Sequence, residues 1–588
     1  MRKCEIRDRR RLMDAAMGHI ACDLTVKNVQ LVNVLTGEIY KAEVDILDGA
    51  VVRVREEGVL SPLPARETLD GEGKYLLPGY IDAHIHVEST MMIPLQAARA
   101  VVPWGTTTIC TDPHEIANVM GEEGVRFMLH DSARAALRQY VLVPSCVPAV
   151  PALERAGAAF GAQEVGRMLD LPGVVGVAEI MDYPGVVQHS ARMEEIIEEG
   201  RKRKLLLQGH APMVSGGALA AYRIGGPVTD HESNSAQEVR EKLRCGMHVN
   251  LRASSIVDHL DDLVCGLDGM TNLEMVSICT DDVHASDLLL KGHVNYIVAR
   301  LIAGGMEPVQ AIRLATINAA REYGFDDLGA IAPGYLADFQ LCEKLDGGQP
   351  QSVYIGGKLV AKNGAYVAEI IGDESCGALP NTMHVGHITG PESFLLPVPG
   401  DQKTAQVLVL GRTGHGIYRS GEWMELPVKD GFLSLENHPE LQFICVVNRH
   451  GAGGHVVGVT RDFGLREGAL ASTVSHDSHN FTVVYRDAAS AYACLKALEA
   501  AGGGMCAARD GACFEVLPLP VAGLMSDKPC KELSQDIHRA ESAMQSLCDK
   551  SFSILNLAVY ALPVIPGMLI TDLGLVDGSR QTFVDGIR

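Results

Sequence analysis

The stretch Leu77-Pro78-Gly79-Tyr80-Ile81-Asp82-Ala83-His84-Ile85-His86 contains the strongest structural signal in this chain. It opens with a turn at Pro78-Gly79 and continues as an apolar run that ends in an H-x-H pair. Residues two apart on a β-strand point to the same side, so His84 and His86 can reach one metal ion together. An isolated H-x-H pair is weak support for a metal site, because buried structural histidines produce the same pattern.

Short apolar runs of this kind recur to about residue 325 and alternate with helix-like stretches such as 193–204 and 236–245. The runs cover residues 80–84, 106–111, 140–144, 174–178, 205–208, 227–229, 247–251 and 275–280. Buried strands that alternate with helices are typical of parallel sheets. Eight of them predict an α/β fold built on a (β/α)₈ TIM-type barrel.

The segments on either side of the predicted barrel have a different pattern. Residues 24–54 alternate apolar and polar positions around Asp48-Gly49, and residues 329–364 return to such strands around Gly356-Gly357. These signals are typical of antiparallel strands joined by tight turns. We therefore expect residues 1–76 and 329–369 to form a small flanking β-sandwich domain, residues 77–328 the barrel, and residues 370–588 an additional C-terminal α/β domain.

Composition excludes several classes of partner. The formal net charge of −22 argues against nucleic acid, and the basic cluster at 7–11 is interrupted by Asp8, as on a solvated helix face. The 15 cysteines form no C-x-x-C pair, which is typical of free thiols in a reducing cytosol. Residues 1–11 lack the apolar core of a signal peptide. The apolar stretch 555–570 is broken by Pro563 and Pro566 and is too short for a membrane span, so we expect buried core there and a cytoplasmic protein.

Further metal-binding residue types lie at the ends of other apolar runs. Glu179 closes the fourth run, His210 the fifth, His231 the sixth and Asp281 the eighth. Any one of them alone is explained by a core histidine or a salt bridge. The C-terminal strand ends of a barrel converge on its active face, so their joint placement favours a metal site. The predicted metal ligands are His84, His86, Glu179, His210, His231 and Asp281.

Two longer motifs resemble a known family. The stretch 77–86 resembles the first-strand motif of the amidohydrolase superfamily, and residues 329–338 (GAIAPGYLAD) resemble its post-barrel motif. Within that superfamily, residues 86–92 (HVESTMM), 111–118 (TDPHEIAN) and 476–480 (HDSHN) resemble loops of adenine deaminases. The resemblance spans nearly the whole chain, except the first dozen residues and residues 347–350.

This resemblance implies a purine-binding hydrolase with two divalent metal ions, Mn²⁺ or Fe²⁺, with Zn²⁺ also suited to the ligands. A metal-bound hydroxide would deaminate adenine to hypoxanthine and ammonia. We expect His84, His86 and Asp281 to hold one metal and His210 and His231 the other. Glu179 would bridge them, since no Lys that could be carboxylated lies between residues 167 and 201.

Asp281 and Glu179 are the predicted catalytic residues, with Asp281 moving the proton from the nucleophile towards the departing amine. Glu88, His114 and Asp282 follow strand ends and are the predicted substrate-binding residues, with loop stabilisation as the alternative. His476 and His479 fit a lid, a second polar site or structural hydrogen bonding. Family resemblance also leads us to expect a homo-oligomer such as a dimer.

Two rival functions remain open at this point. Another amidohydrolase reaction, such as cyclic-amide or N-acyl hydrolysis, would use the same barrel and metals. A non-enzymatic scaffold on this fold would have lost the ligands that are all present here. The H-x-E at residues 86–88 also matches zinc cytidine-type deaminases, but their downstream P-C-x-x-C is absent.

Overall fold

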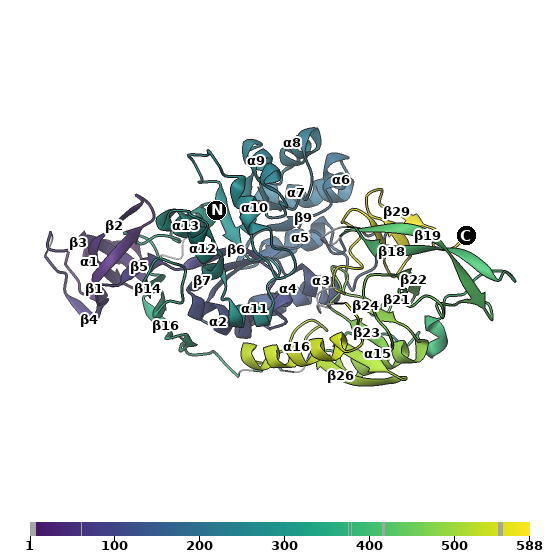
Figure 1. Ribbon diagram of the computed structural model, residues 1–588. Coiled ribbons are helices and arrows are strands. Elements are labelled where there is room, and N and C mark those ends of the chain that lie inside the picture. The colour runs from purple at the N-terminus through teal and green to yellow at the C-terminus, as the bar shows by residue number, and fades with distance from the viewer. Residues whose placement is uncertain (1–7, 60, 374, 378, 414–417, 551–556) are drawn as a thin grey trace.

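The computed structural model describes residues 8–59, 61–373, 375–377, 379–413, 418–550 and 557–588. Within these ranges, parallel strands of a five-stranded sheet (β10-β9-β8-β7-β6) and a three-stranded sheet (β11-β12-β13) form the centre of the molecule (Figure 1). They are β6 (Tyr80–Ile85), β7 (Thr106–Thr111), β8 (Arg138–Val143), β9 (Val174–Ile180), β10 (Leu206–Gly209), β11 (Thr229–Asp230), β12 (His248–Arg252) and β13 (Val276–Cys279).

Hydrogen bonds join the two sheets at both seams. At one seam, the backbone N–H of Val228 donates to Leu207 O at 3.0 Å. At the other, the N–H of Asp281 donates to His84 O at 2.9 Å. The sheets therefore close into the barrel that the sequence predicted, and each predicted run lies within a few residues of a strand.

Helices cover the outside of this barrel. They are α2 (Pro94–Val101), α3 (His114–Met120), α4 (Glu122–Ser132), α5 (Ala162–Leu169), α6 (Tyr183–Val187), α7 (Ala191–Arg203), α8 (Gly216–Gly225), α9 (Ala236–Arg244), α10 (Leu260–Cys265), α11 (Ala285–Leu290), α12 (Val294–Ala303), α13 (Pro308–Leu314) and α14 (Ile317–Glu322). Helix α7 shows why they form: the Ser190 side chain caps its first turn, and Met193, Ile196, Ile197 and Gly200 form its buried stripe.

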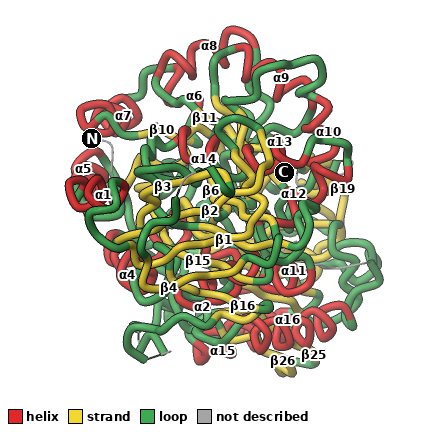
Figure 2. The backbone as a smooth tube through the Cα atoms, turned by 90° about the vertical axis from the view of Figure 1, so that its left-hand side faces the viewer, coloured by secondary structure: helices red, strands yellow, loops and turns green. Residues whose placement is uncertain are grey.

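The flanking sheet combines strands from before and after the barrel. It contains β1 (Cys22–Asn33), β2 (Glu38–Leu47), β3 (Ala50–Glu56), β4 (Ala65–Asp70), β5 (Tyr75–Pro78), β14 (Phe339–Cys342), β15 (Ser352–Ile355), β16 (Lys358–Lys362) and β17 (Ala365–Tyr366). Strand β14 pairs antiparallel with β5, which confirms that the later segment returns to the earlier one. The β2–β3 turn has positive φ at Asp48 and Gly49, as a tight hairpin requires. In Figure 2 this sheet lies in front of the barrel.

The C-terminal part of the chain is built on a second, mainly antiparallel sheet. Its strands are β18 (Thr404–Arg412), β19 (Arg419–Lys429), β20 (Phe432–Leu433), β21 (Gln442–Val447), β22 (His455–Thr460), β23 (Ala469–Ser472), β24 (Phe481–Tyr485), β25 (Gly504–Arg509) and β26 (Ala512–Pro518). Helices α15 (Ala488–Ala501) and α16 (Cys530–Gln545) pack on it, and a small sheet of β27 (Met568–Ile570), β28 (Leu575–Asp577) and β29 (Thr582–Val584) follows. The predicted additional domain of helices and strands is thus confirmed.

The barrel and the C-terminal part share one hydrophobic core. Met92 and Leu95 of the barrel belong to the same buried cluster as Met525 and Leu533. Ser526 strengthens this junction, because its N–H donates to Met91 O at 2.8 Å. Helix α16 also packs against α2 and α11, as Figure 1 shows below the barrel.

Several smaller expectations concern the chain ends. Helix α1 (Arg9–Ala16) exposes its first arginines, whereas residues 1–7 lie outside the described part. In the stretch 555–570, Leu557, Tyr560 and Leu569 are buried, and residues 555 and 556 are not described. Among the described residues, no helix is both long enough and apolar enough to cross a membrane.

The post-barrel motif joins the flanking sheet to the barrel through an ion pair between a buried carboxylate and a partly buried guanidinium. Arg138 of β8 donates to both carboxylate oxygens of Asp338, with Nε–Oδ2 at 2.5 Å and Nη2–Oδ1 at 3.0 Å. Gly356 N–H also donates to this carboxylate at 2.7 Å. The motif therefore has a structural role at its last residue.

We predict that Asp338→Ala strongly destabilises the protein. It removes the carboxylate that the partly buried Arg138 guanidinium contacts with two nitrogens. Loss of one partner from a fully buried pair costs about 3–5 kcal/mol, which sets the upper bound here. Urea unfolding should show a clear fall in the midpoint. Arg126→Ala breaks the more exposed pair with Glu122 and should cost less than about 1 kcal/mol. Equal effects of the two substitutions would contradict this role for Asp338.

Candidate metal centre and active site

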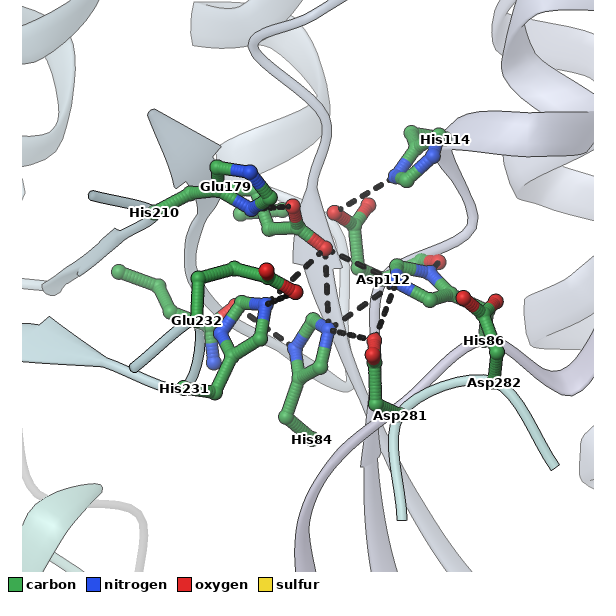
Figure 3. Close-up of polar contacts among 12 residues, drawn as sticks. His84, His86, Asp112, His114, Glu179, His210, His231, Glu232, Asp281 and Asp282 are labelled. Carbon is green, nitrogen blue, oxygen red and sulfur yellow. Dashed lines mark hydrogen bonds and ion pairs between the residues drawn. The ribbon is translucent and has the colours of Figure 1, made fainter. Parts of the chain in front are cut away.

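All six predicted metal-ligating side chains meet at the C-terminal end of the barrel (Figure 3). They lie on β6 or directly after it, on β9, and just after β10, β11 and β13. His210 is partly exposed, and the other five are buried. The cluster consists of His84, His86, Glu179, His210, His231 and Asp281, and we call it the Glu179 cluster.

The carboxylate of Glu179 lies between two groups of imidazoles. Its Oε1 is 3.0 Å from His84 Nε2 and 2.9 Å from His86 Nε2. Its Oε2 is 2.6 Å from His210 Nδ1. The His231 ring stacks on His84 with centroids 3.9 Å apart, and its Nε2 is 3.7 Å from Glu179 Oε1. This arrangement is the one that a bridging carboxylate requires.

Asp281 joins the cluster from the opposite side of the barrel seam. Its Oδ1 is 3.2 Å from His86 Nε2 and 3.5 Å from His84 Nε2. Its Oδ2 accepts a hydrogen bond of 2.9 Å from Arg252 Nη1. One oxygen therefore faces the candidate ligands and the other faces a fixed cation.

Hydrogen bonds outside the cluster set the tautomers of the paired histidines. His84 Nδ1 donates to the side-chain oxygen of Gln208, and His86 Nδ1 donates to Asp112 O, each at 3.0 Å. In the neutral rings both Nε2 atoms then carry lone pairs, and these atoms lie only 3.1 Å apart. Two facing lone pairs repel each other unless a cation lies between them. Such outer hydrogen bonds are typical of metal-ligating histidines.

Unsatisfied polar atoms in the cluster also fit metal binding. Glu179 Oε1, His210 Nδ1 and both ring nitrogens of His231 are buried without a hydrogen-bond partner among the described residues. Buried polar atoms rarely remain unpaired, so these atoms are suited to an ion held by several donors at once. Donor atoms of His84, Glu179, His231 and Asp281 lie within 4.8 Å of one another.

Both carboxylates of the cluster remain charged at neutral pH. Burial raises the pKa of Glu179, but the imidazoles of His210 and His231 outweigh it and hold this pKa well below its ordinary value. Burial also raises the pKa of Asp281. The Arg252 guanidinium outweighs this effect and holds the pKa of Asp281 well below its ordinary value. Against the opposing effect of burial, the carboxylates raise the pKa of His84 to about 9 and that of His86 well above its ordinary value, so metal binding would displace protons from these rings. Carboxylate and imidazole donors together match the set that Mn²⁺, Fe²⁺ and Zn²⁺ accept.

The Glu179 cluster forms one wall of a cavity of about 300 Å³. Arg252, Glu232 and Ile256 of the barrel line the same cavity. The C-terminal part completes the lining with Tyr418, His476, Asp477, Val559, Leu562 and Ile565. A planar heterocycle fits this mixture of apolar walls and a few polar groups.

The three predicted substrate-binding residues differ in their positions. Asp282 and His114 line the cavity. Asp282 accepts a hydrogen bond from Ser89 Oγ at 2.6 Å, and the His114 ring packs edge-on against His86. Glu88 is buried away from the cavity lining and accepts a hydrogen bond from Ile116 N at 3.2 Å.

Sequence reasoning missed Arg252 and Glu232. Arg252 ends β12 and contacts both Asp281 and Glu232, so it orients the carboxylate opposite the paired histidines. The signal was present, because Arg252 follows the seventh apolar run. A search restricted to metal-ligating residue types passes over a guanidinium.

Comparisons with known proteins agree with this geometry. Residues 75–360 match the model of the amidohydrolase family, and residues 417–582 match that of the adenine deaminase C-terminal domain. The chain is 38% identical to adenine deaminase 2 of Carboxydothermus hydrogenoformans and 38% identical to adenine deaminase of Desulfatibacillum aliphaticivorans. Each alignment covers 97% of this chain and 98% of the relative.

Among solved structures, a β-aspartyl dipeptidase of Fervidobacterium islandicum AW-1 matches 59% of this chain and 98% of its own, with 18% identity and a TM-score of 0.44. The full-length relatives are the decisive finding, because they match the barrel and the C-terminal domain together. The chain belongs to the adenine deaminase family of the amidohydrolases.

Proposed function

We propose that this protein hydrolyses adenine to hypoxanthine and ammonia. The observation that carries the proposal is the position of the Glu179 cluster, which opens onto a cavity of about 300 Å³ closed by the C-terminal domain. That domain matches the adenine deaminase C-terminal model, and the full-length relatives bear the same name. Hydrolysis of cyclic amides or N-acyl groups needs no such domain and is not favoured.

Two divalent metal ions fit the Glu179 cluster, and we propose Mn²⁺ or Fe²⁺, with Zn²⁺ also suited to the donors. His84, His86 and Asp281 would hold one ion, His210 and His231 the other, and Glu179 would bridge them. Bound there, the metals supply a nucleophile at neutral pH by lowering the pKa of water. The remaining chemistry falls to the side chains.

Asp281 is the proposed proton carrier. Its Oδ1 faces His84 and His86, and its Oδ2 accepts a hydrogen bond from Arg252. The carboxylate held in this way would take a proton from the attacking water and deliver it to the exocyclic amine of adenine. Arg252 keeps the carboxylate oriented before the proton arrives. Oxygen adds at C6, the C6–N6 bond breaks, and ammonia leaves.

Binding of the purine ring is proposed to involve Asp282 and His114, which line the cavity, rather than Glu88, which does not. Asp282 Oδ1 is already oriented by Ser89, so the carboxylate presents an acceptor to a ring N–H. The apolar side chains of Val559, Leu562 and Ile565 would cover the faces of the base.

We further propose a cytoplasmic location, which the free state of every cysteine in the described ranges supports. Assembly into a homo-oligomer stays a prediction from family resemblance.

The function is tested with Mn²⁺-loaded protein by ammonia release from adenine, adenosine and guanine. Chromatographic product analysis is used for a hydantoin and an N-acetyl amino acid, because their hydrolysis releases no ammonia. Adenine should be hydrolysed at least about 10²-fold more efficiently than the others, because unpaired buried polar groups penalise an analogue strongly. Faster opening of the hydantoin, with no ammonia from adenine, would contradict the proposal.

Glu179→Gln should lose the paired metals and the activity, since a neutral amide cannot bridge two cations as a carboxylate does. Metal content per chain is measured by mass spectrometry after gel filtration. The matched control is Glu322→Gln, whose buried side chain accepts hydrogen bonds from Asn250 and Ser277 away from the cluster. Retention of both tightly held metals in Glu179→Gln would remove it as the bridge.

Asp281→Asn should lower kcat by about 10²–10⁴-fold even where metal is retained, because its amide cannot accept the proton. KM should change far less, since the loss lies in the transition state. Asp282→Asn should show the opposite pattern, with a raised KM and a smaller effect on kcat. If Asp282→Asn abolishes turnover while Asp281→Asn is mild, the two roles are exchanged.

A further inference from the structure

A second group of histidines and carboxylates lies where the barrel meets the C-terminal domain. His114 and Glu115 begin helix α3 after β7, and His476 and Asp477 lie in the loop after β23. All four side chains are buried, with exposed fractions between 0% and 6%. We call these residues the junction cluster; the proposed deamination gives three of them no role.

The spacing of the junction cluster suits a coordination shell better than direct hydrogen bonding. His114 Nε2 is 3.6 Å from Asp477 Oδ1, and His476 Nδ1 is 3.6 Å from Glu115 Oε1. Donor atoms of His114, Glu115 and His476 all lie within 4.8 Å of one another. With metal–ligand bonds of about 2.0–2.2 Å, neighbouring ligand atoms around one ion lie about 3.0–3.6 Å apart.

The junction cluster also contains unpaired atoms that are fully buried. His114 Nε2, Glu115 Oε2 and Asp477 Oδ2 have no hydrogen-bond partner in the part of the chain that the structure describes. The other ring nitrogen of His114 donates to Asp112 Oδ2 at 3.0 Å, which leaves a lone pair on Nε2. A carboxylate behind an imidazole is a recurrent support for metal-ligating histidines.

The junction cluster places two carboxylates beside imidazoles, a charge pattern that suits a cation. Ser89 Oγ donates to Glu115 Oε1 at 2.8 Å, and Glu115 Oε2 stays unpaired among the described residues. Among the described residues, Glu115 and Asp477 form ion pairs with histidines and with no Lys or Arg. His479 does not act as a ligand here, because its Nδ1 accepts from Ser475 N and its Nε2–H therefore faces Glu115. Buried carboxylates are stable only when paired, protonated or bound to a metal.

We propose that His114, Glu115 and His476, flanked by Asp477, bind one divalent transition-metal ion that is separate from the pair at Glu179. The ion links the barrel to the C-terminal domain at the wall of the active cavity, which His114, His476 and Asp477 line. This assignment replaces the purine contact proposed above for His114, whose Nε2 then faces the ion, and leaves Asp282 as the proposed polar contact of the base. The inference goes beyond the proposed deamination and does not depend on it.

The test counts Mn²⁺ per chain in the full-length protein after loading and gel filtration. The wild type should hold one Mn²⁺ more than Glu115→Gln or His476→Gln, and Glu179→Gln should keep the junction ion while losing the paired ones. Mn²⁺ should also raise the Tm of Glu179→Gln, an effect that the added Glu115→Gln substitution removes. The control His450→Gln alters a partly buried histidine that is bonded to Ser478 O and should keep the wild-type count.

Anomalous diffraction from wild-type crystals at the manganese edge gives a check that needs no variant. A peak between His114, Glu115 and His476 is expected, and a water molecule at that position would overturn the proposal. An equal metal count in wild type and Glu115→Gln would overturn it too. If the protein does not hydrolyse adenine, the metal count and the anomalous peak remain unchanged. The proposed deamination and the proposed junction ion can therefore be refuted independently.

Discussion

The hydrogen bonds between the first and the eighth barrel strand set the geometry of the Glu179 cluster. Asp281 N–H donates to His84 O at 2.9 Å, and His86 N–H donates to Asp281 O at 3.2 Å. The backbone that closes the barrel thus brings three of the candidate ligands together. Asp281 has φ of 59°, a left-handed conformation that Asp tolerates better than most residues. The chain turns away from the eighth strand at this residue. The site therefore lies at the C-terminal end of the barrel, beside the seam between the first and eighth strands.

The C-terminal domain is needed for a closed substrate cavity, because the barrel supplies only one of its walls. Leu562 and Ile565 provide apolar surface opposite the Glu179 cluster. The shared core around Met92 and Met525 fixes this domain against the barrel. Other amidohydrolases carry out different reactions on the same barrel, so the barrel alone does not determine specificity for a purine. We therefore expect the residues that recognise the purine in the C-terminal domain and in the barrel loops that contact it.

The sequence predicted the barrel and the convergence of its ligands because both follow from local rules. Strand periodicity locates Glu179 and His231 at strand ends, and the barrel topology then brings those ends together. Glu88 shows where such rules fail, since the chain after His86 enters a short 3₁₀ helix (Val87–Thr90) and no longer alternates as a strand. The contact between His114 and Asp477 joins segments far apart in the sequence, and no periodic pattern encodes it. Domain packing and the irregular turns after strand ends are what sequence patterns leave undetermined.

Buried charge connects the stability of this fold to its chemistry. Glu179 and Asp281 are both charged and both buried from water. Arg252 forms an ion pair with Asp281 but not with Glu179. Removing an ion from water without full compensation costs several kcal/mol. Hydrophobic packing around the barrel offsets this unfavourable free energy and holds the donors in place. Binding of cations would then lower the free energy of the folded state further. Because the imidazoles already lie 2.6–3.0 Å from the Glu179 carboxylate, binding of cations requires little rearrangement of the protein.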